Sequence, residues 1–392
     1  THGHLDHTGY LPRLVKEGFK GKIIGTAPTL QIAEIILKDS AKIQEEDAIR
    51  ANKHKYTKHH PAKPLYDLKD VENTLPLFEV SPLNEWILIN ETIKYRFRYN
   101  GHIIGASFIE LNINDKTLVF SGDIGREIDP LLFPAEKPTE ADILFIEATY
   151  GNRLHPDRPV IEALEEIINN CSKKNGTIII PSFSVERIQV LMYLLWQLKK
   201  NNRMPNIPIY MDSPMGTNVL EVFHKNVTWH KLSTYECSEM CHEIKLIKTV
   251  KETLSLADDP RPKIIIAGSG MSTGGRVLMY FAKYLGNANA TILMVGYQAA
   301  GTRGKAMLDG AKEVKLYGKF FKVRATIKNI EGLSGHADQR ELINWLADLK
   351  NKPERIFIVH SEKDGAIGLR DKILEVYGWD THIAELGEIV KL

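Results

Sequence analysis

The sequence has few cysteines, no long apolar run and almost no net charge, and each of these absences excludes a class of protein. Three cysteines in 392 residues are too few, and odd in number, for a secreted disulfide framework, so we expect a reducing, cytoplasmic compartment. No stretch approaches the roughly 18 uncharged apolar residues of a membrane helix, so we expect no membrane partner. Lys and Arg number 51 and Asp and Glu 49, and this net charge of +2 does not by itself predict a nucleic-acid partner. Any site for a polyanion must therefore be a local patch.

What the sequence does contain is typical of a globular α/β protein of two or three domains. Apolar residues make up 43% and charged residues 26%, and apolar runs alternate with amphipathic stretches. An antiparallel meander is expected within the first part, residues 1–155. Residues 156–325 instead contain strands that are apolar on both faces, which is typical of a parallel sheet covered by helices. Residues 326–392 return to the pattern of strands and helices seen in residues 1–155, so we predict one domain interrupted by another.

The chain opens with the motif H-x-H-x-D-H, formed by His2, His4, Asp6 and His7. In a turn after a strand, such close spacing can aim imidazoles at one metal while the neighbouring Asp and His reach a second. Imidazole nitrogen and carboxylate oxygen are ligands that zinc prefers. The alternative is a merely polar segment, but the motif predicts a metal site.

Three further candidate ligands lie near the ends of predicted strands, namely His102, Asp123 and His360. Strand ends are where α/β folds place ligands, although each residue alone would more often be structural. Together with the first motif they supply enough donors for two metals, and Asp123 could bridge the two with its two oxygens. A bridged pair of ions makes a hydroxide at neutral pH and stabilises the attacking and leaving oxygens of a displacement at phosphorus.

These motifs carry a family resemblance. The order HGHLDH, GH, SGD resembles the metallo-β-lactamase superfamily, and IEATYG, LSGHAD and VHSE resemble motifs A, B and C of its β-CASP branch, the nucleic-acid nucleases. The resemblance implies an α/β fold, an αββα sandwich split by an inserted β-CASP domain with a parallel sheet. Within this branch, the sequence is similar to the endonuclease subunit of the mRNA cleavage and polyadenylation factor and to the bacterial and archaeal relatives of that subunit. Such proteins have strands ahead of the first motif, so we expect residues to precede Thr1 in the complete protein.

The resemblance also implies a role for each motif residue. One zinc would be held by His2, His4 and His102 and the other by Asp6, His7 and His360, with Asp123 shared. Catalytic roles fall to Asp6, His336 and Glu147. His336 would donate a proton to the leaving oxygen, because the pKa of an imidazole lies near working pH. Glu147 would hydrogen-bond to His336, fix its tautomer and favour its charged form. His at position 360 is typical of the members that cut RNA.

The inserted segment supplies candidate contacts to RNA phosphates. Ser269 and Gly270 lie in GSGMSTGGR, whose glycines would let backbone N–H groups approach an anion just before a predicted helix. A tight turn between strand and helix is the alternative. Arg187, Arg276 and Arg303 could each bind a phosphate in a bidentate way, or could instead be paired within the fold.

The resemblance therefore implies a phosphodiesterase with two zinc ions that cuts single-stranded RNA, by internal cleavage, through a metal-activated hydroxide. Products with a 3′-hydroxyl and a 5′-phosphate would follow. Three alternatives stay open: an exoribonuclease that acts from the 5′ end like RNase J, a non-catalytic scaffold subunit of RNA processing, and a hydrolase of thioester, lactam or sulfate bonds. A homodimer is implied by the resemblance only.

Overall fold

The computed structural model describes residues 1–55 and 57–391, which form two compact units. The outer unit comprises Thr1–Leu154 and Gly335–Leu392, and the inserted unit comprises His155–Ser334. Within the described residues, no helix combines the length and the apolarity needed to cross a bilayer.

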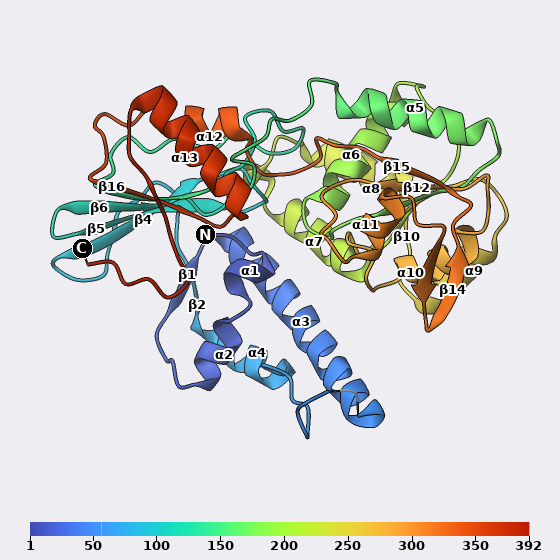
Figure 1. The fold of residues 1–392 in the computed structure, drawn as a ribbon, viewed down its shortest axis with the longest axis horizontal. Coiled ribbons are helices and arrows are strands. Elements are labelled where there is room, and N and C mark those ends of the chain that lie inside the picture. The colour runs from blue at the N-terminus through green and yellow to red at the C-terminus, as the bar shows by residue number, and fades with distance from the viewer. Residues whose placement is uncertain (56, 392) are drawn as a thin grey trace. The chain divides into compact units, whose positions relative to one another are not determined.

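The outer unit contains a seven-stranded sheet in the order β17-β16-β7-β6-β5-β4-β3 (Figure 1). Its strands are β3 (Ile87–Leu88), β4 (Ile93–Tyr99), β5 (Ser107–Ile113), β6 (Lys116–Phe120), β7 (Ile143–Glu147), β16 (Arg355–Val359) and β17 (His382–Ile383). Strands β3 to β6 form an antiparallel meander, whereas β6, β7, β16 and β17 are parallel. Strands β4 and β6 both run antiparallel to β5, and β7 and β16 run parallel to β6. Strands β4, β6, β7 and β16 therefore all end at the same edge of the sheet.

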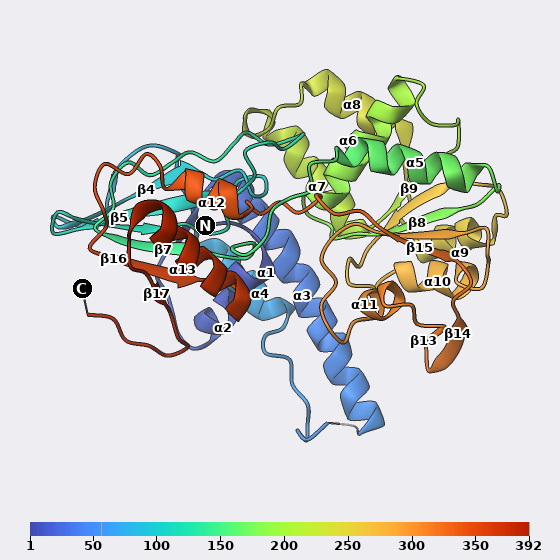
Figure 2. The same cartoon turned by 45° about the horizontal axis from the view of Figure 1, so that its top comes forward.

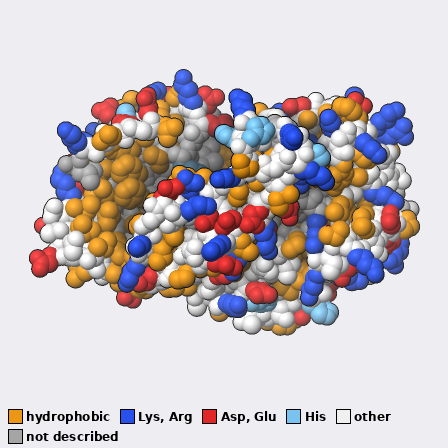
Figure 3. Space-filling model, turned by 90° about the horizontal axis from the view of Figure 1, so that it is seen from below, with side chains coloured by type: hydrophobic (Ala, Val, Ile, Leu, Met, Phe, Trp, Pro, Cys, Tyr) orange, Lys and Arg blue, Asp and Glu red, His pale blue; other side chains and the backbone are white. Residues whose placement is uncertain are grey.

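The two faces of this sheet differ in their cover. Helices α12 (Gln339–Trp345) and α13 (Lys363–Tyr377) lie over one face (Figures 1 and 2), where Leu144 and Trp345 belong to a buried core cluster. On the opposite face the rings of Phe120, Phe145 and Phe357 form a stack, with centroids 4.7 and 5.0 Å apart. Figure 3 shows the molecule from below Figure 1, and apolar side chains gather there over the outer unit, at the left of the view. The pleat thus sends alternate residues of one strand into two different environments.

The rest of the outer unit is mainly helical and leads into the sheet. It consists of α1 (Leu5–Thr8), α2 (Leu11–Lys16), α3 (Ala27–His54), α4 (Leu68–Thr74), a 3₁₀ turn (Leu75–Leu77) and the parallel pair β1 (Ile23–Gly25) and β2 (Phe78–Val80). The N-cap of α3 is Thr26, whose hydroxyl accepts a hydrogen bond from the backbone N–H of Thr29. The same hydroxyl donates to the carbonyl of Gly105, which ties the start of α3 to the loop after β4.

The inserted unit is built on a six-stranded parallel sheet in the order β10-β9-β11-β8-β12-β15. The strands are β8 (Ile178–Pro181), β9 (Ile209–Asp212), β10 (Ile244–Leu246), β11 (Ile264–Ala267), β12 (Thr291–Met294) and β15 (Thr326–Asn329). The helices are α5 (Val160–Ser172), α6 (Arg187–Lys200), α7 (Pro214–Lys225), α8 (Thr234–Glu243), α9 (Val250–Asp258), α10 (Val277–Tyr284) and α11 (Arg303–Leu308), with a 3₁₀ turn at Val227–Trp229. An antiparallel hairpin joins β13 (Glu313–Leu316) to β14 (Lys319–Lys322). Successive residues of β11 are buried on both faces, as a covered parallel sheet requires.

One predicted boundary needs correction. The sequence pattern places residue 326 at the start of the returning outer domain, but Thr326 pairs with Thr291 when β15 joins β12 in the inserted sheet. The inserted unit therefore continues to Ser334. The local pattern of a short strand does not reveal its pairing partner, which explains the difference.

Candidate metal centre

The candidate ligands come together at the edge of the seven-stranded sheet where four strands end. His102 follows β4, Asp123 follows β6, Glu147 ends β7 and His360 follows β16. His360 has a φ of 49°, a left-handed conformation that residues other than glycine adopt rarely and often at functional sites. The edge formed by the strand ends thus collects residues that are far apart in the sequence.

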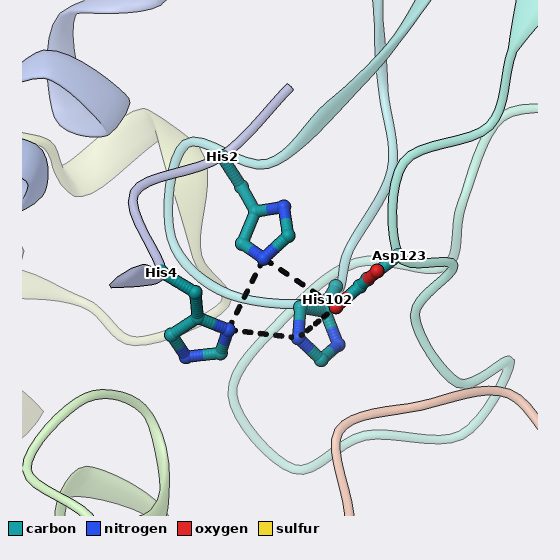
Figure 4. Close-up of side chains that lie close together, drawn as sticks. All are labelled: His2, His4, His102 and Asp123. Carbon is teal, nitrogen blue, oxygen red and sulfur yellow. Dashed lines mark hydrogen bonds and ion pairs between the residues drawn. The ribbon is translucent and has the colours of Figure 1, made fainter. Parts of the chain in front are cut away.

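Four of the candidate residues direct one donor atom each to a common point (Figure 4). The Nδ1 atom of His4 lies 3.1 Å from Nε2 of His2 and 3.3 Å from Nε2 of His102. One oxygen of Asp123, Oδ2, lies 3.5 Å from Nε2 of His2 and also 3.5 Å from Nε2 of His102. Donors about 2.0–2.1 Å from a tetrahedral zinc ion would lie about 3.3 Å from one another. The donor types and their separations therefore fit zinc.

Burial also favours the neutral form of the imidazoles of His2, His4 and His102. It lowers the pKa of His4 to about 4 and the pKa values of His2 and His102 well below the usual range. The three rings are therefore neutral near pH 7, and a neutral imidazole has the free lone pair that a metal needs.

The second group of candidate ligands surrounds the other oxygen of Asp123. Its Oδ1 atom lies 3.2 Å from Nε2 of His7 and 3.2 Å from Nδ1 of His360. Asp6 also belongs to this group, and its Oδ2 atom lies 3.3 Å from Nε2 of His360. That hydrogen bond is the largest cause of a lowered pKa, about 2, for Asp6, which is therefore anionic. Because the two oxygens of Asp123 face different groups, this carboxylate could be shared by two ions.

His336 and Glu147 lie together next to these groups. The Nδ1 atom of His336 lies 3.1 Å from Oε1 of Glu147, and Nε2 of His336 lies 3.9 Å from Oδ2 of Asp123. The fully buried carboxylate of Glu147 also accepts hydrogen bonds from the backbone N–H groups of Ile124 and Thr149, at 2.8 and 3.0 Å. A carboxylate held in this way can only accept, so the Nδ1 atom of His336 carries the proton and Nε2 faces the candidate metal ligand Asp123.

The carboxylate of Glu147 also shifts the protonation of His336. Burial is the largest single effect and lowers the pKa of His336, but the charge of Glu147, the hydrogen bond to it and the charge of Asp123 together raise that pKa by more, so the net pKa is raised. The imidazolium form consequently persists to higher pH than for an exposed histidine.

Sequence reasoning missed Asn100, which holds two ligand loops in place. Its buried Nδ2 atom donates to the carbonyl of Ser121 at 2.7 Å and to the carbonyl of Asp123 at 2.5 Å. The backbone carbonyl of Asn100 accepts from the backbone N–H of Gly125 at 2.8 Å. The signal in the sequence was an amide residue directly after a strand and two positions before His102.

Two of the predicted phosphate-binding arginines are bonded within the inserted unit. Arg276 donates to a carboxylate oxygen of Asp212 at 2.5 Å and to the carbonyl of Lys248 at 2.8 Å. Arg303 donates to the carbonyl of Lys315 at 2.8 Å and to the carbonyl of Thr273 at 2.7 Å. These bonds favour the structural alternative for both arginines.

The other three predicted contacts lie near one another. Arg187, the first residue of α6, places its guanidinium 5.5 Å from the ring centroid of Phe183. Ser269 and Gly270 follow β11, and a Cβ atom at Gly270 would come within 2.5 Å of the Phe183 ring. The glycine therefore lets the loop approach this ring closely, beside Arg187.

Comparison with known proteins identifies the family of this chain. Residues 188–307 match the family model of the Beta-Casp domain, and residues 321–384 match that of the Zn-dependent metallo-hydrolase RNA specificity domain. A ribonuclease of Thermus thermophilus is 32% identical over 397 residues, which cover 99% of this chain and 86% of the relative. The chain belongs to the β-CASP ribonuclease family of the metallo-β-lactamase fold. The resemblance and the fold class inferred from the motifs are thus confirmed, and the chain is a metal-dependent hydrolase.

Longer relatives match as well. The transcription termination factor FttA of Methanococcus maripaludis is 30% identical over 97% of this chain, and that of Pyrococcus horikoshii is 29% identical over the whole chain. The chain spans about three fifths of the length of these archaeal β-CASP relatives, 60% and 61% respectively.

Proposed function

We propose that this β-CASP protein hydrolyses phosphodiester bonds within single-stranded RNA and that it holds two zinc ions per chain. The observation that carries the proposal is the position of Asp123, whose two oxygens face two separate groups of metal-ligand side chains. The RNA substrate is supported by the family model for RNA specificity and by the relative named as a ribonuclease. A cytoplasmic location and a homodimer remain predictions.

The seven candidate ligands divide into two sets around the shared carboxylate. His2, His4 and His102 would hold one zinc ion, Asp6, His7 and His360 would hold the other, and Asp123 would contact both. When bound, the two ions supply Lewis acidity, which lowers the pKa of water and offsets negative charge that develops at phosphorus. The side chains of this chain then have to orient the phosphodiester and move protons.

His336 is placed to protonate the leaving group. As oxygen from water bonds to phosphorus and the bond from phosphorus to O3′ breaks, Nε2 of His336 would give its proton to O3′. The product ends are a 5′-phosphate and a 3′-hydroxyl, and the proton lost from water passes to solvent. Glu147 serves as a positioning residue, because it orients the ring of His336 and favours its protonated form. His360 favours RNA as the substrate by family resemblance alone.

Contacts to the RNA backbone would come from the inserted unit. Ser269 and Gly270 present backbone near Arg187, the predicted arginine that lies beside this loop. Arg276 and Arg303 support the loop instead, through the bonds described above. We propose phosphate contact for Arg187, Ser269 and Gly270, because these residues lie close together around Phe183, and a structural role for Arg276 and Arg303.

The experiment that tests the proposal offers circular and linear forms of one RNA, labelled internally, to the zinc-loaded protein and to Asp123→Ala. We expect the parent to cut both forms and the variant to cut neither. Cleavage of the linear form alone would replace internal cleavage with action from an end. Failure of the parent to cut either form, with two zinc ions confirmed in the sample, would favour the non-catalytic scaffold. Cleavage of a thioester in place of RNA would favour a hydrolase of thioester, lactam or sulfate bonds.

A further inference from the structure

The β13–β14 hairpin of the inserted unit exposes two aromatic rings. The side chains of Tyr317 and Phe320 are 61% and 67% exposed, and Figure 2 shows the hairpin protruding from its unit. Tyr317 has a φ of 50° in a two-residue turn with Gly318, whose φ is 80°. Asn or Gly would occupy that first turn position at lower conformational cost. An aromatic ring at such a position therefore needs an explanation other than the turn itself.

The pairing of the hairpin places cations beside the exposed rings. Phe320 pairs with Lys315, and Lys322 pairs with Glu313, so both lysines share the outer face with the ring of Phe320. Val314 points to the other face, into the core of the inserted unit. Residues 312–324 carry five cations and one carboxylate. These cations are Lys312, Lys315, Lys319, Lys322 and Arg324, and all five side chains are exposed.

The hairpin is also fixed to the glycine loop that follows β11. Arg303 donates to the carbonyl of Lys315 in β13 and to the carbonyls of Ser272 and Thr273 in the loop, at 2.8, 3.1 and 2.7 Å. One guanidinium thus joins the segment with the exposed rings to the segment proposed to contact phosphate. The hairpin and the loop are therefore held next to each other within the inserted unit.

We propose that the hairpin is a second contact for single-stranded RNA, in which unpaired bases stack on Tyr317 and Phe320 and the neighbouring lysines contact phosphates. Aromatic rings interleaved with cations are how proteins hold single strands without reading their sequence. A second copy of this chain would bring an equally positive hairpin and be repelled, whereas a polyanion is attracted. The inference rests on the proposed RNA substrate and adds a place where the strand is held away from the metal ligands.

The test compares the double variant Tyr317→Ala/Phe320→Ala with the parent and with Tyr235→Ala, a matched control. Tyr235 lies in α8 of the same unit and is 65% exposed. We expect the double variant to raise KM for a long single-stranded RNA about fivefold or more per ring lost, and to leave kcat and the thermal midpoint unchanged. Phe320→Trp, which keeps an aromatic surface, should retain the affinity of the parent.

A direct measurement accompanies the kinetics. RNA that contains 4-thiouridine is irradiated with the zinc-loaded protein, and cross-linked peptides are identified by mass spectrometry. Cross-links within residues 312–324, lost in the double variant, are the expected result.

Two outcomes would overturn the inference, and a third separates it from the proposed function. If the parent cuts RNA but KM and cross-links are the same in the double variant, the hairpin is not an RNA contact. If the double variant instead changes only the mass measured by sedimentation, a second copy of the chain occupies the surface. If the parent neither cuts nor cross-links RNA, the proposed function fails, and the hairpin contact fails with it.

Discussion

The Nδ1 atom of His336 lies 3.1 Å from Oε1 of Glu147, although 189 residues separate the two in the sequence. Glu147 ends β7 before the inserted unit, and His336 follows that unit, so the fold brings the pair together across the whole insertion. Their neighbour Asp123 lies 3.9 Å from the other nitrogen of His336. The pair is therefore placed to couple proton transfer to the candidate metal groups.

Replacement of Glu147 by Gln should shift the pH dependence of cleavage. The charge of Glu147 raises the pKa of His336, so its removal lowers that pKa, and the protonated ring is lost at a lower pH. We expect the alkaline limb of the profile of kcat/KM against pH to move to lower pH in Glu147→Gln, with equal zinc content. An alkaline limb that stays in place would show that Glu147 does not set the protonation of His336.

Removal of the imidazole at position 336 should abolish most turnover without loss of metal. General acid catalysis by a positioned side chain contributes about 10²–10⁴-fold, and we expect kcat of His336→Ala to fall within that range. His382→Ala is a suitable control, because His382 is an exposed histidine of the same unit paired with Glu388. Loss of zinc from His336→Ala, measured by elemental analysis, would contradict the assigned role.

Asn100→Ala should weaken metal binding although Asn100 is not a candidate ligand. The side chain holds the carbonyls of Ser121 and Asp123, and outer partners of this kind are worth about 10–100-fold in metal affinity. Competition with a zinc-binding dye measures the effect. Asn112→Ala, in β5 of the same sheet, should leave the affinity unchanged. Equal zinc affinities of the parent and Asn100→Ala would show that Asn100 does not support metal binding.

Gly125→Ala should disturb the segment that carries His102. A Cβ atom at Gly125 would lie 2.1 Å from the carbonyl carbon of Gly101, so the backbone next to His102 must shift. We expect a loss of about 1–3 kcal/mol in the free energy of unfolding, together with reduced zinc content. Gly286→Ala is the control, because no atom lies within 4 Å of a Cβ there. A stable variant with full zinc content would show that the segment tolerates the shift.

Much of the candidate site could be predicted because its residues lie in short, recognisable motifs. H-x-H-x-D-H brings four donors close in the chain, and His102, Asp123 and His360 each follow an apolar strand. The alternation of strands and helices likewise indicated the α/β class. Each of these motifs is local in the sequence, and the fold brings their residues together at the edge of the sheet where the strands end.

Other features depend on pairing across the fold, which the sequence pattern does not contain. The end of the insertion was wrong because only the pairing of β15 with β12 assigns that strand. Arg276 and Arg303 looked like candidate phosphate ligands, but their acceptors include Asp212 and the carbonyl of Thr273, which lie 64 and 30 positions away in the sequence. Asn100 was missed for the same reason, since its role consists of bonds to two carbonyls of another loop.

Titration of metal-free protein with zinc, while cleavage is followed in the same sample, measures whether RNA cleavage needs two ions held around Asp123. We predict that cleavage appears as two equivalents bind and that Asp123→Ala stays inactive at every zinc concentration. His102→Ala and His360→Ala should each retain about one ion, because the two residues belong to different groups. Full cleavage by the metal-free protein, or by Asp123→Ala, would show that RNA cleavage does not depend on ions held around Asp123.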